Sequence, residues 1–141
     1  MANDVKIQVR RVSATTSEAA IREHRVTIDR PAAKGGSDLG PMGGELFLAA
    51  VGGCFMSNLL AAMKARDVEI SAVRTDVTGI LDGAPPRFVG VELEVSADGA
   101  DRETLEKLTE IAERACIMTN TLRGKMDLTV RVTAAPVDHP I

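Results

Sequence analysis

The sequence contains few of the residues on which several common functions depend. Of 141 residues only three are aromatic, all of them Phe, and the chain has two cysteines and two histidines. A chain so poor in aromatic rings lacks the platforms on which proteins stack single-stranded nucleic acid. No Cys-x-x-Cys or His-x-x-x-His spacing occurs, which argues against a zinc site. No glycine-rich phosphate loop follows a predicted strand, so no cofactor is expected.

The charge balance and the apolar pattern narrow the range of partners. A net charge of −3 gives no electrostatic reason to bind nucleic acid or an anionic membrane. No apolar stretch is predicted to reach the length of a membrane span, and the N-terminal residues lack the apolar core of a signal peptide. Two widely separated cysteines are too few for a secreted disulfide scaffold. The expected location is therefore the cytoplasm.

The order of the predicted elements indicates an α+β fold. A chain of this length is the usual size of one domain, so residues 1–141 are predicted to form a single domain. Strands and helices are segregated along the chain instead of alternating regularly. In chain order they are strands at 5–13 and 19–28, a helix at 45–66, a hairpin of strands at 70–81 and 87–97, a helix after Asp101, a short turn from Thr119 to Arg123, and a strand at 126–134.

The predicted helix that contains Cys54 is apolar almost all round, which is typical of a helix buried at the centre of a domain. Gly52 and Gly53 interrupt it, although glycine costs about 1 kcal/mol relative to alanine inside a helix. These glycines indicate close approach of another backbone, or a kink beside the cysteine. Ser57 and Asn58 form a polar pair one turn beyond Cys54, where they either contact a neighbouring element or serve the thiol.

The two cysteines are the only credible site of covalent chemistry. Periodicity alone allows both to be small apolar residues on buried helical faces. The alternative is a redox pair, in which any disulfide within the chain must join Cys54 to Cys116. Cys116 is predicted near a helix C-terminus, where the dipole disfavours a thiolate, and this suits a resolving residue better than an attacking one. An activated Cys54 needs a cation, for which the candidates are Arg22, Arg25 and Arg30.

Three segments of the sequence resemble the signatures of the OsmC/Ohr family. They occur in the family's order and together cover roughly residues 20–133. They are Gly40-Pro41 with Glu45-Leu46-Phe47-Leu48-Ala49-Ala50-Val51-Gly52-Gly53-Cys54, Pro85-Pro86-Arg87-Phe88, and Ala112-Glu113-Arg114-Ala115-Cys116 with Asn120-Thr121-Leu122.

The resemblance implies a fold, an assembly and an activity. The fold is the OsmC-like α+β fold, in which antiparallel strands surround a long central buried helix, and the assembly is an intertwined homodimer. The activity is reduction of a small organic hydroperoxide: Cys54 attacks the peroxide and becomes a sulfenic acid, and Cys116 then closes a disulfide that an external thiol reduces.

Other site residues follow from the same resemblance. Phe47, Met56 and Met118 are expected to form an apolar wall for the peroxide, with core packing as the alternative. Glu45 is a further catalytic candidate, although the peroxidase branches of the family carry their glutamate one position earlier. On an unbroken helix Glu45 faces away from Cys54, so it would act only through a kink or across a second subunit.

The activating arginine of those branches has no counterpart in the turn at 15–18, which reads Thr-Thr-Ser-Glu. The sequence therefore resembles the broader OsmC-like branch. A competing hypothesis is a non-enzymatic dimer that binds a small apolar ligand or senses oxidation through the same cysteines.

Overall fold

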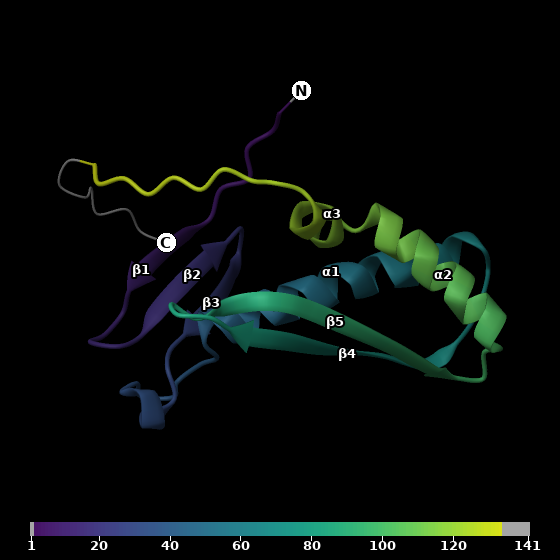
Figure 1. The fold of residues 1–141 in the computed structure, drawn as a ribbon, viewed down its shortest axis with the longest axis horizontal. Coiled ribbons are helices and arrows are strands. Elements are labelled where there is room, and N and C mark those ends of the chain that lie inside the picture. The colour runs from purple at the N-terminus through teal and green to yellow at the C-terminus, as the bar shows by residue number, and fades with distance from the viewer. Residues whose placement is uncertain (1, 134–141) are drawn as a thin grey trace. The chain divides into compact units, whose positions relative to one another are not determined.

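In the computed structural model, which describes residues 2–133, an antiparallel meander of three strands forms the first sheet (Figure 1). Its strands are β1 (Gln8–Arg11), β2 (Ser17–Ile21) and β3 (His24–Ile28). The single strand predicted at 19–28 is wrong, because Arg22 adopts a left-handed φ of 54° and turns the chain between β2 and β3. The strand predicted at 5–13 is confirmed as β1, which is shorter than expected, but its predicted half-burial is wrong because all residues of β1 are exposed.

The long helix that contains Cys54 is α1 (Gly43–Ala65), and it runs without a break. The predicted helix is therefore confirmed, and the predicted kink is not. Burial differs from the prediction, because only one face of α1 is covered by the rest of the chain. The buried residues are Val51, Gly52, Phe55, Leu59, Ala62 and Met63. Small residues such as Ala49, Ala50 and Gly53 lie on the exposed side.

Among the described residues, α1 is also the one helix that is long and apolar enough to cross a membrane. Its most apolar window has a mean hydropathy of 1.9, and 33% of that window is buried inside the chain. This corrects the expectation that no stretch reaches such a length. The finding rests on length and composition alone, and the core helix of a water-soluble domain passes the same test.

A long antiparallel hairpin, β4 (Ser71–Asp82) and β5 (Arg87–Asp98), confirms the predicted pair of strands. α1 lies along this hairpin (Figure 1). The closest approach is at Gly52, where an added Cβ would lie 2.6 Å from Cγ2 of Val77 on β4. Gly52 thus admits a side chain of the hairpin, whereas the space beside Gly53 is open.

Two further helices complete the described chain. α2 (Arg102–Ala115) begins where predicted, with Asp101 Oδ1 accepting a 2.7 Å hydrogen bond from the N–H of Thr104. α3 (Ile117–Arg123) extends the predicted short turn, and a 3-10 turn, η1 (Ala32–Lys34), lies between β3 and α1. The strand predicted at 126–134 is wrong, because residues 126–133 form no strand; residue 134 lies outside the described residues.

The chain divides into two units, each with its own internal contacts. The first unit contains the described residues up to Leu46 together with those from Thr129 onward, and the second is Phe47–Leu128. The main apolar core belongs to the second unit and joins α1 to α2. Its buried members are Phe55, Leu59, Ala62, Met63, Leu108, Ala112 and Cys116.

Candidate redox site

The structure brings the two cysteines together within the second unit. Cys54 lies in the middle of α1, and Cys116 lies at the junction between α2 and α3. Both are free thiols, and their Sγ atoms are 3.4 Å apart, with the Cys116 thiol donating to Cys54. Cys116 is completely buried, whereas Cys54 is only partly buried. The site is a reduced dithiol with one inner and one outer sulfur atom.

The surroundings of Cys116 favour its thiolate. Burial raises the pKa of Cys116. The thiolate of Cys116 accepts hydrogen bonds from the hydroxyl and N–H of Thr119, from Cys54, which is then the donor, and from the N–H of Met118, and these lower the pKa by more. The net pKa lies below the usual value for a thiol. This corrects the electrostatic expectation from the sequence: Cys116 follows α2, but it also precedes α3, and the N–H groups of Met118 and Thr119 at the start of α3 lower its pKa.

Cys54 has one polar neighbour on its own helix. The Nδ2 atom of Asn58 donates to the carbonyl oxygen of Cys54 at 2.9 Å and lies 3.9 Å from its Sγ atom. Asn58 therefore serves the turn that holds Cys54 and does not contact a neighbouring element through these bonds. Ser57, the other member of the polar pair, is exposed.

Glu45 caps the beginning of α1. Its Oε1 atom accepts a 2.9 Å hydrogen bond from the N–H of Met42. Because α1 is unbroken, Glu45 precedes Cys54 by about two and a half turns of the same helix. The unbroken helix thus excludes a kink that would turn Glu45 toward Cys54. Of the two routes considered from the sequence, only contact across a second subunit remains.

The three candidate arginines belong to the first unit and make local contacts there. Arg25 lies 3.9 Å from Glu18 on β2 and donates to the carbonyl oxygen of His24. Arg22 forms the turn between β2 and β3, and Arg30 follows β3 at the start of the loop that leads to α1. None of these contacts involves a cysteine.

A cavity of about 440 Å³ lies within the second unit, and neither Cys54 nor Cys116 lines it. α1 and β5 supply its apolar walls. The side supplied by α2 and α3 is its rim, which consists of Thr109, Glu113, Thr119, Leu122 and Arg123. Phe47 lines this cavity and stacks on Phe88, with ring centroids 5.5 Å apart. Met56 and Met118 instead pack against the apolar core. Of the three predicted wall residues, only Phe47 is brought to the cavity.

The rim contains the only charged side chains of the cavity, Glu113 on α2 and Arg123 on α3, which form an ion pair. Thr119 also lines the rim, so the residue that hydrogen-bonds to Cys116 faces the cavity as well. Sequence reasoning missed Glu113, Thr119 and Arg123. No pattern marks them, because they come from two different helices, Glu113 from α2 and Thr119 and Arg123 from α3.

The fold and the paired thiols define the class of protein: an α+β protein with an antiparallel hairpin, a long helix and a dithiol at its core. Residues 35–131 match the family model described as OsmC-like protein. The match covers more than half of the chain, which therefore belongs to the OsmC family. A search of curated proteins gave no match.

Solved structures agree with the family. An OsmC-like protein of unknown function from Vibrio cholerae is 14% identical with a TM-score of 0.71, covering 86% of this chain and 95% of that one. An organic hydroperoxide resistance protein OsmC from Legionella pneumophila is 19% identical with a TM-score of 0.67, covering 88% and 92%. The organic hydroperoxide resistance protein OhrB of Bacillus subtilis is 25% identical with a TM-score of 0.63, covering 89% and 94%. These likenesses confirm the predicted OsmC-like α+β fold.

The OsmC/Ohr family is linked to resistance to peroxide and other stress, and its members are often peroxidase-like.

Proposed function

We propose that this chain is a thiol-dependent reductase of organic hydroperoxides. In the first step the thiolate of Cys54 attacks one peroxide oxygen, and an S–O bond forms as the O–O bond breaks. The leaving alkoxide takes a proton from water and departs as the alcohol. In the second step Cys116 attacks the sulfur of the resulting sulfenic acid, forming the disulfide and releasing water. An external thiol then supplies two electrons and restores both thiols, a step suited to the reducing cytoplasm.

The observation that carries this proposal is the 3.4 Å distance between two sulfur atoms of unequal exposure. A peroxide can reach Cys54, which is partly exposed, and cannot reach the fully buried Cys116. The separation exceeds the roughly 2.05 Å of a disulfide, so closing the bond requires a further approach of only about 1.4 Å. This difference in exposure supports Cys54 as the attacking residue and Cys116 as the resolving one.

The acidity of Cys116 supports the resolving role. Attack on a sulfenic acid requires a thiolate, and the lowered pKa of Cys116 raises the fraction of thiolate available at neutral pH. The hydrogen bond between the two thiols also lets the proton of one sulfur remain with its neighbour while the other is ionised.

The proposed active form is a homodimer. Two apolar surfaces of the described chain support it, because exposed apolar surface of this extent is typical of an interface. One is the open side of α1, which includes Ala50, Gly53 and Leu60. The other is the segment at 126–132, whose apolar side chains are almost fully exposed: Met126 75%, Leu128 88%, Val130 88% and Val132 98%.

Within the dimer, a charged activator for Cys54 would come from the partner chain. Glu45 would take part in catalysis only across the interface, since in its own chain it caps α1. An arginine of the first unit, Arg22, Arg25 or Arg30, would supply the cation in the same way.

The test mixes the reduced protein with one equivalent of cumene hydroperoxide and follows peroxide loss together with the thiol state by mass spectrometry. We expect rapid consumption and a disulfide between Cys54 and Cys116 in the wild type. Cys54→Ser should abolish consumption, and Cys116→Ser should leave a sulfenic acid after one turnover. Loss of peroxide no faster than with a free thiol in solution would contradict the proposal.

A second candidate function is a non-enzymatic dimer that binds a small apolar ligand, and the cavity beside Phe47 favours it. Cys54→Ala separates the two functions. A binding protein retains its ligand affinity in this variant, whereas a peroxidase loses its activity.

A further inference from the structure

We propose that the cavity binds an amphiphilic monocarboxylic acid, whose apolar chain lies against the phenylalanine rings and whose carboxylate is held by Arg123. The inference concerns binding alone and requires no redox step. It goes beyond the proposed peroxidase reaction and stands or falls independently of it.

The apolar part of the cavity concentrates all the aromatic side chains of the protein. The chain has three phenylalanines and no tyrosine or tryptophan, and Phe47, Phe55 and Phe88 all line this one cavity. Phe47 and Phe88 stack with an angle of 18° between their planes and form a flat wall. Phe55 is nearly fully buried and fixes the inner end. A volume of about 440 Å³ is within the range of small-molecule sites.

The polar side chains that line the cavity all come from α2 and α3. Two hydroxyls, from Thr109 and Thr119, and the ion pair of Glu113 with Arg123 complete the lining on the side of α2 and α3. A ligand that is apolar along its length and polar at one end matches this division. Because one end only of the lining is charged, a ligand with charges at both ends would bury one of them against the phenylalanine rings, at a high cost.

The ion pair determines which charge the polar end of the ligand should carry. The side chain of Arg123 is 68% exposed and that of Glu113 is 39% exposed, so the side chain of Arg123 is the more accessible of the two to a ligand. The pair engages one terminal nitrogen, Nη2, whereas a guanidinium carries five N–H donors in a fork that fits carboxylates. Arg123 can thus accept a second carboxylate, and Glu113 then acts as a competitor that weakens binding of the acid.

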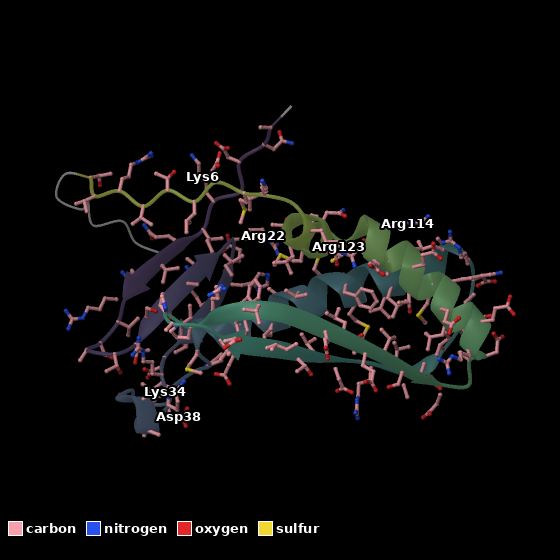
Figure 2. All side chains as sticks on the ribbon, in the orientation of Figure 1. Lys6, Arg22, Lys34, Asp38, Arg114 and Arg123 are labelled. Atoms are coloured by element: carbon pink, nitrogen blue, oxygen red, sulfur yellow. The ribbon has the colours of Figure 1, made fainter. Side chains whose placement is uncertain are left out.

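The chain offers a matched control for Arg123. Arg114 on α2 also forms an ion pair, with Glu110, and its side chain is 79% exposed, but it does not line the cavity. Figure 2 labels both arginines, Arg123 on α3 and Arg114 on α2. Removing either guanidinium removes one exposed charge and one surface ion pair, so any difference between the two variants reports the cavity.

The experiment titrates the reduced full-length protein with decanoic acid, decanol or decylamine by calorimetry, below the concentrations at which they aggregate and with no peroxide present. We expect decanoic acid to bind about tenfold more tightly than decanol, the scale of one charge-assisted hydrogen bond. Arg123→Gln should remove that advantage and leave decanol unaffected. Glu113→Gln should raise the affinity for the acid several-fold, and Arg114→Gln should change nothing.

Three results would overturn the inference: equal affinity for acid and alcohol, preference for the amine, or weaker binding of the acid by Glu113→Gln. Each variant is first checked by thermal unfolding, which changes in an exposed ion pair should hardly move. The assay also separates this inference from the proposed function. Peroxide turnover without binding of decanoic acid would refute the acid site alone, and binding without turnover would refute the peroxidase alone.

Discussion

The two units of the chain are stabilised in opposite ways. In the first, the described residues that are fully buried are few, and two of the three are polar: Thr16, Ala19 and Asp29. The second has a continuous apolar core that connects α1 with α2 and includes the inner cysteine, Cys116. One unit is organised around a buried carboxylate, and the other around aliphatic packing.

Asp29 is the centre of the first unit. It is only 3% exposed and accepts hydrogen bonds from the Thr16 hydroxyl at 3.0 Å and from three backbone N–H groups, those of Arg30, Ser37 and Leu39. These bonds fasten β3 to the loop that leads to α1. A carboxylate that is so fully bonded can remain ionised when it is buried.

The comparison indicates that the first unit has too little apolar core of its own to be stable by itself. Its apolar side chains are left outside: Val5 is 93% exposed, and Ile7, Val9 and Val12 are each more than half exposed. Hydrogen bonds contribute little net stability each, so a unit without an apolar core is marginal by itself. The second unit contains the candidate redox site and has the core that can hold its geometry.

The largest effect is expected from breaking the apolar core. Leu59 is fully buried, so Leu59→Ala should lower the free energy of unfolding by about 3 kcal/mol through the cavity it creates. The adjacent Leu60 is 49% exposed in the single chain, so Leu60→Ala should cost less than about 1 kcal/mol when the protein is too dilute to dimerise, and more once the proposed dimer forms. Urea unfolding of both variants measures the difference. Equal losses would show that the open side of α1 is covered as well. If the loss at Leu60 also depends on protein concentration, the partner chain of the dimer provides that cover.

Gly52 and Gly53 give the next effect, on the same helix. Gly52→Ala forces a methyl group against Val77 and should destabilise the protein by about 2 kcal/mol. Gly53→Ala meets open space in the single chain and should stabilise the dilute monomer by up to about 1 kcal/mol through helix propensity, whereas the added methyl group should weaken the proposed dimer. Thermal unfolding and light scattering of the two variants test this. A Gly53→Ala variant that is less stable and dissociates on dilution would place the partner chain directly at this residue.

The elements that the sequence predicted well carry their own local signals. The cap at Asp101 requires only Thr104 three residues later, and the hairpin of β4 and β5 is marked by alternation on both sides of a Pro-rich turn. The segment at 126–133 shows equally good alternation and forms no strand. A strand exists through hydrogen bonds to a neighbour, so alternation alone cannot reveal whether the chain supplies one.

The candidate site was predictable to the extent that its residues are scarce. With two cysteines, any disulfide within the chain had to join Cys54 to Cys116, and the resemblance to the OsmC/Ohr family implied a shared site; the structure brings their sulfur atoms within 3.4 Å. The surroundings were not predictable, because Thr119 and Arg123 reach the cavity from α3, a separate helix that begins just after Cys116. The start of this helix also changed the expected electrostatics of the inner thiol.

A smaller effect, confined to acid pH, should come from Asp29 in the first unit. Burial raises the pKa of Asp29, but the N–H groups of Arg30 and Leu39 and the hydroxyls of Thr16 and Thr15 lower it by more, so the net pKa falls below its ordinary 3.8. A carboxyl with a lowered folded pKa contributes stability above its unfolded pKa and loses it as the pH falls through the folded value. Asp29→Asn should therefore flatten the acid limb of the stability curve, as followed by denaturant unfolding. An unchanged acid limb would assign acid unfolding to other groups.

The smallest effect should come from the inner thiol of the second unit, at the opposite end of the pH scale. Because the pKa of Cys116 is lowered from its ordinary 9.0, its contribution to stability is absent below the folded pKa and grows as the pH rises toward the unfolded value. Thr119→Val removes the hydroxyl that favours the thiolate, so it should raise the pKa of Cys116 and reduce this alkaline gain. Thr119→Ser retains the hydroxyl and should restore both.

The thiolate absorbance in the ultraviolet, titrated in the wild type and both Thr119 variants with Cys116→Ser as the reference, measures the pKa, and urea unfolding at neutral and alkaline pH measures the gain. Identical titrations of the valine and serine variants would mean that the backbone N–H groups at the start of α3 stabilise the thiolate without the hydroxyl. In that case the acidity of the inner thiol would depend on the position of Cys116 at the start of α3, and the side chain of Thr119 would matter only for the rim of the cavity.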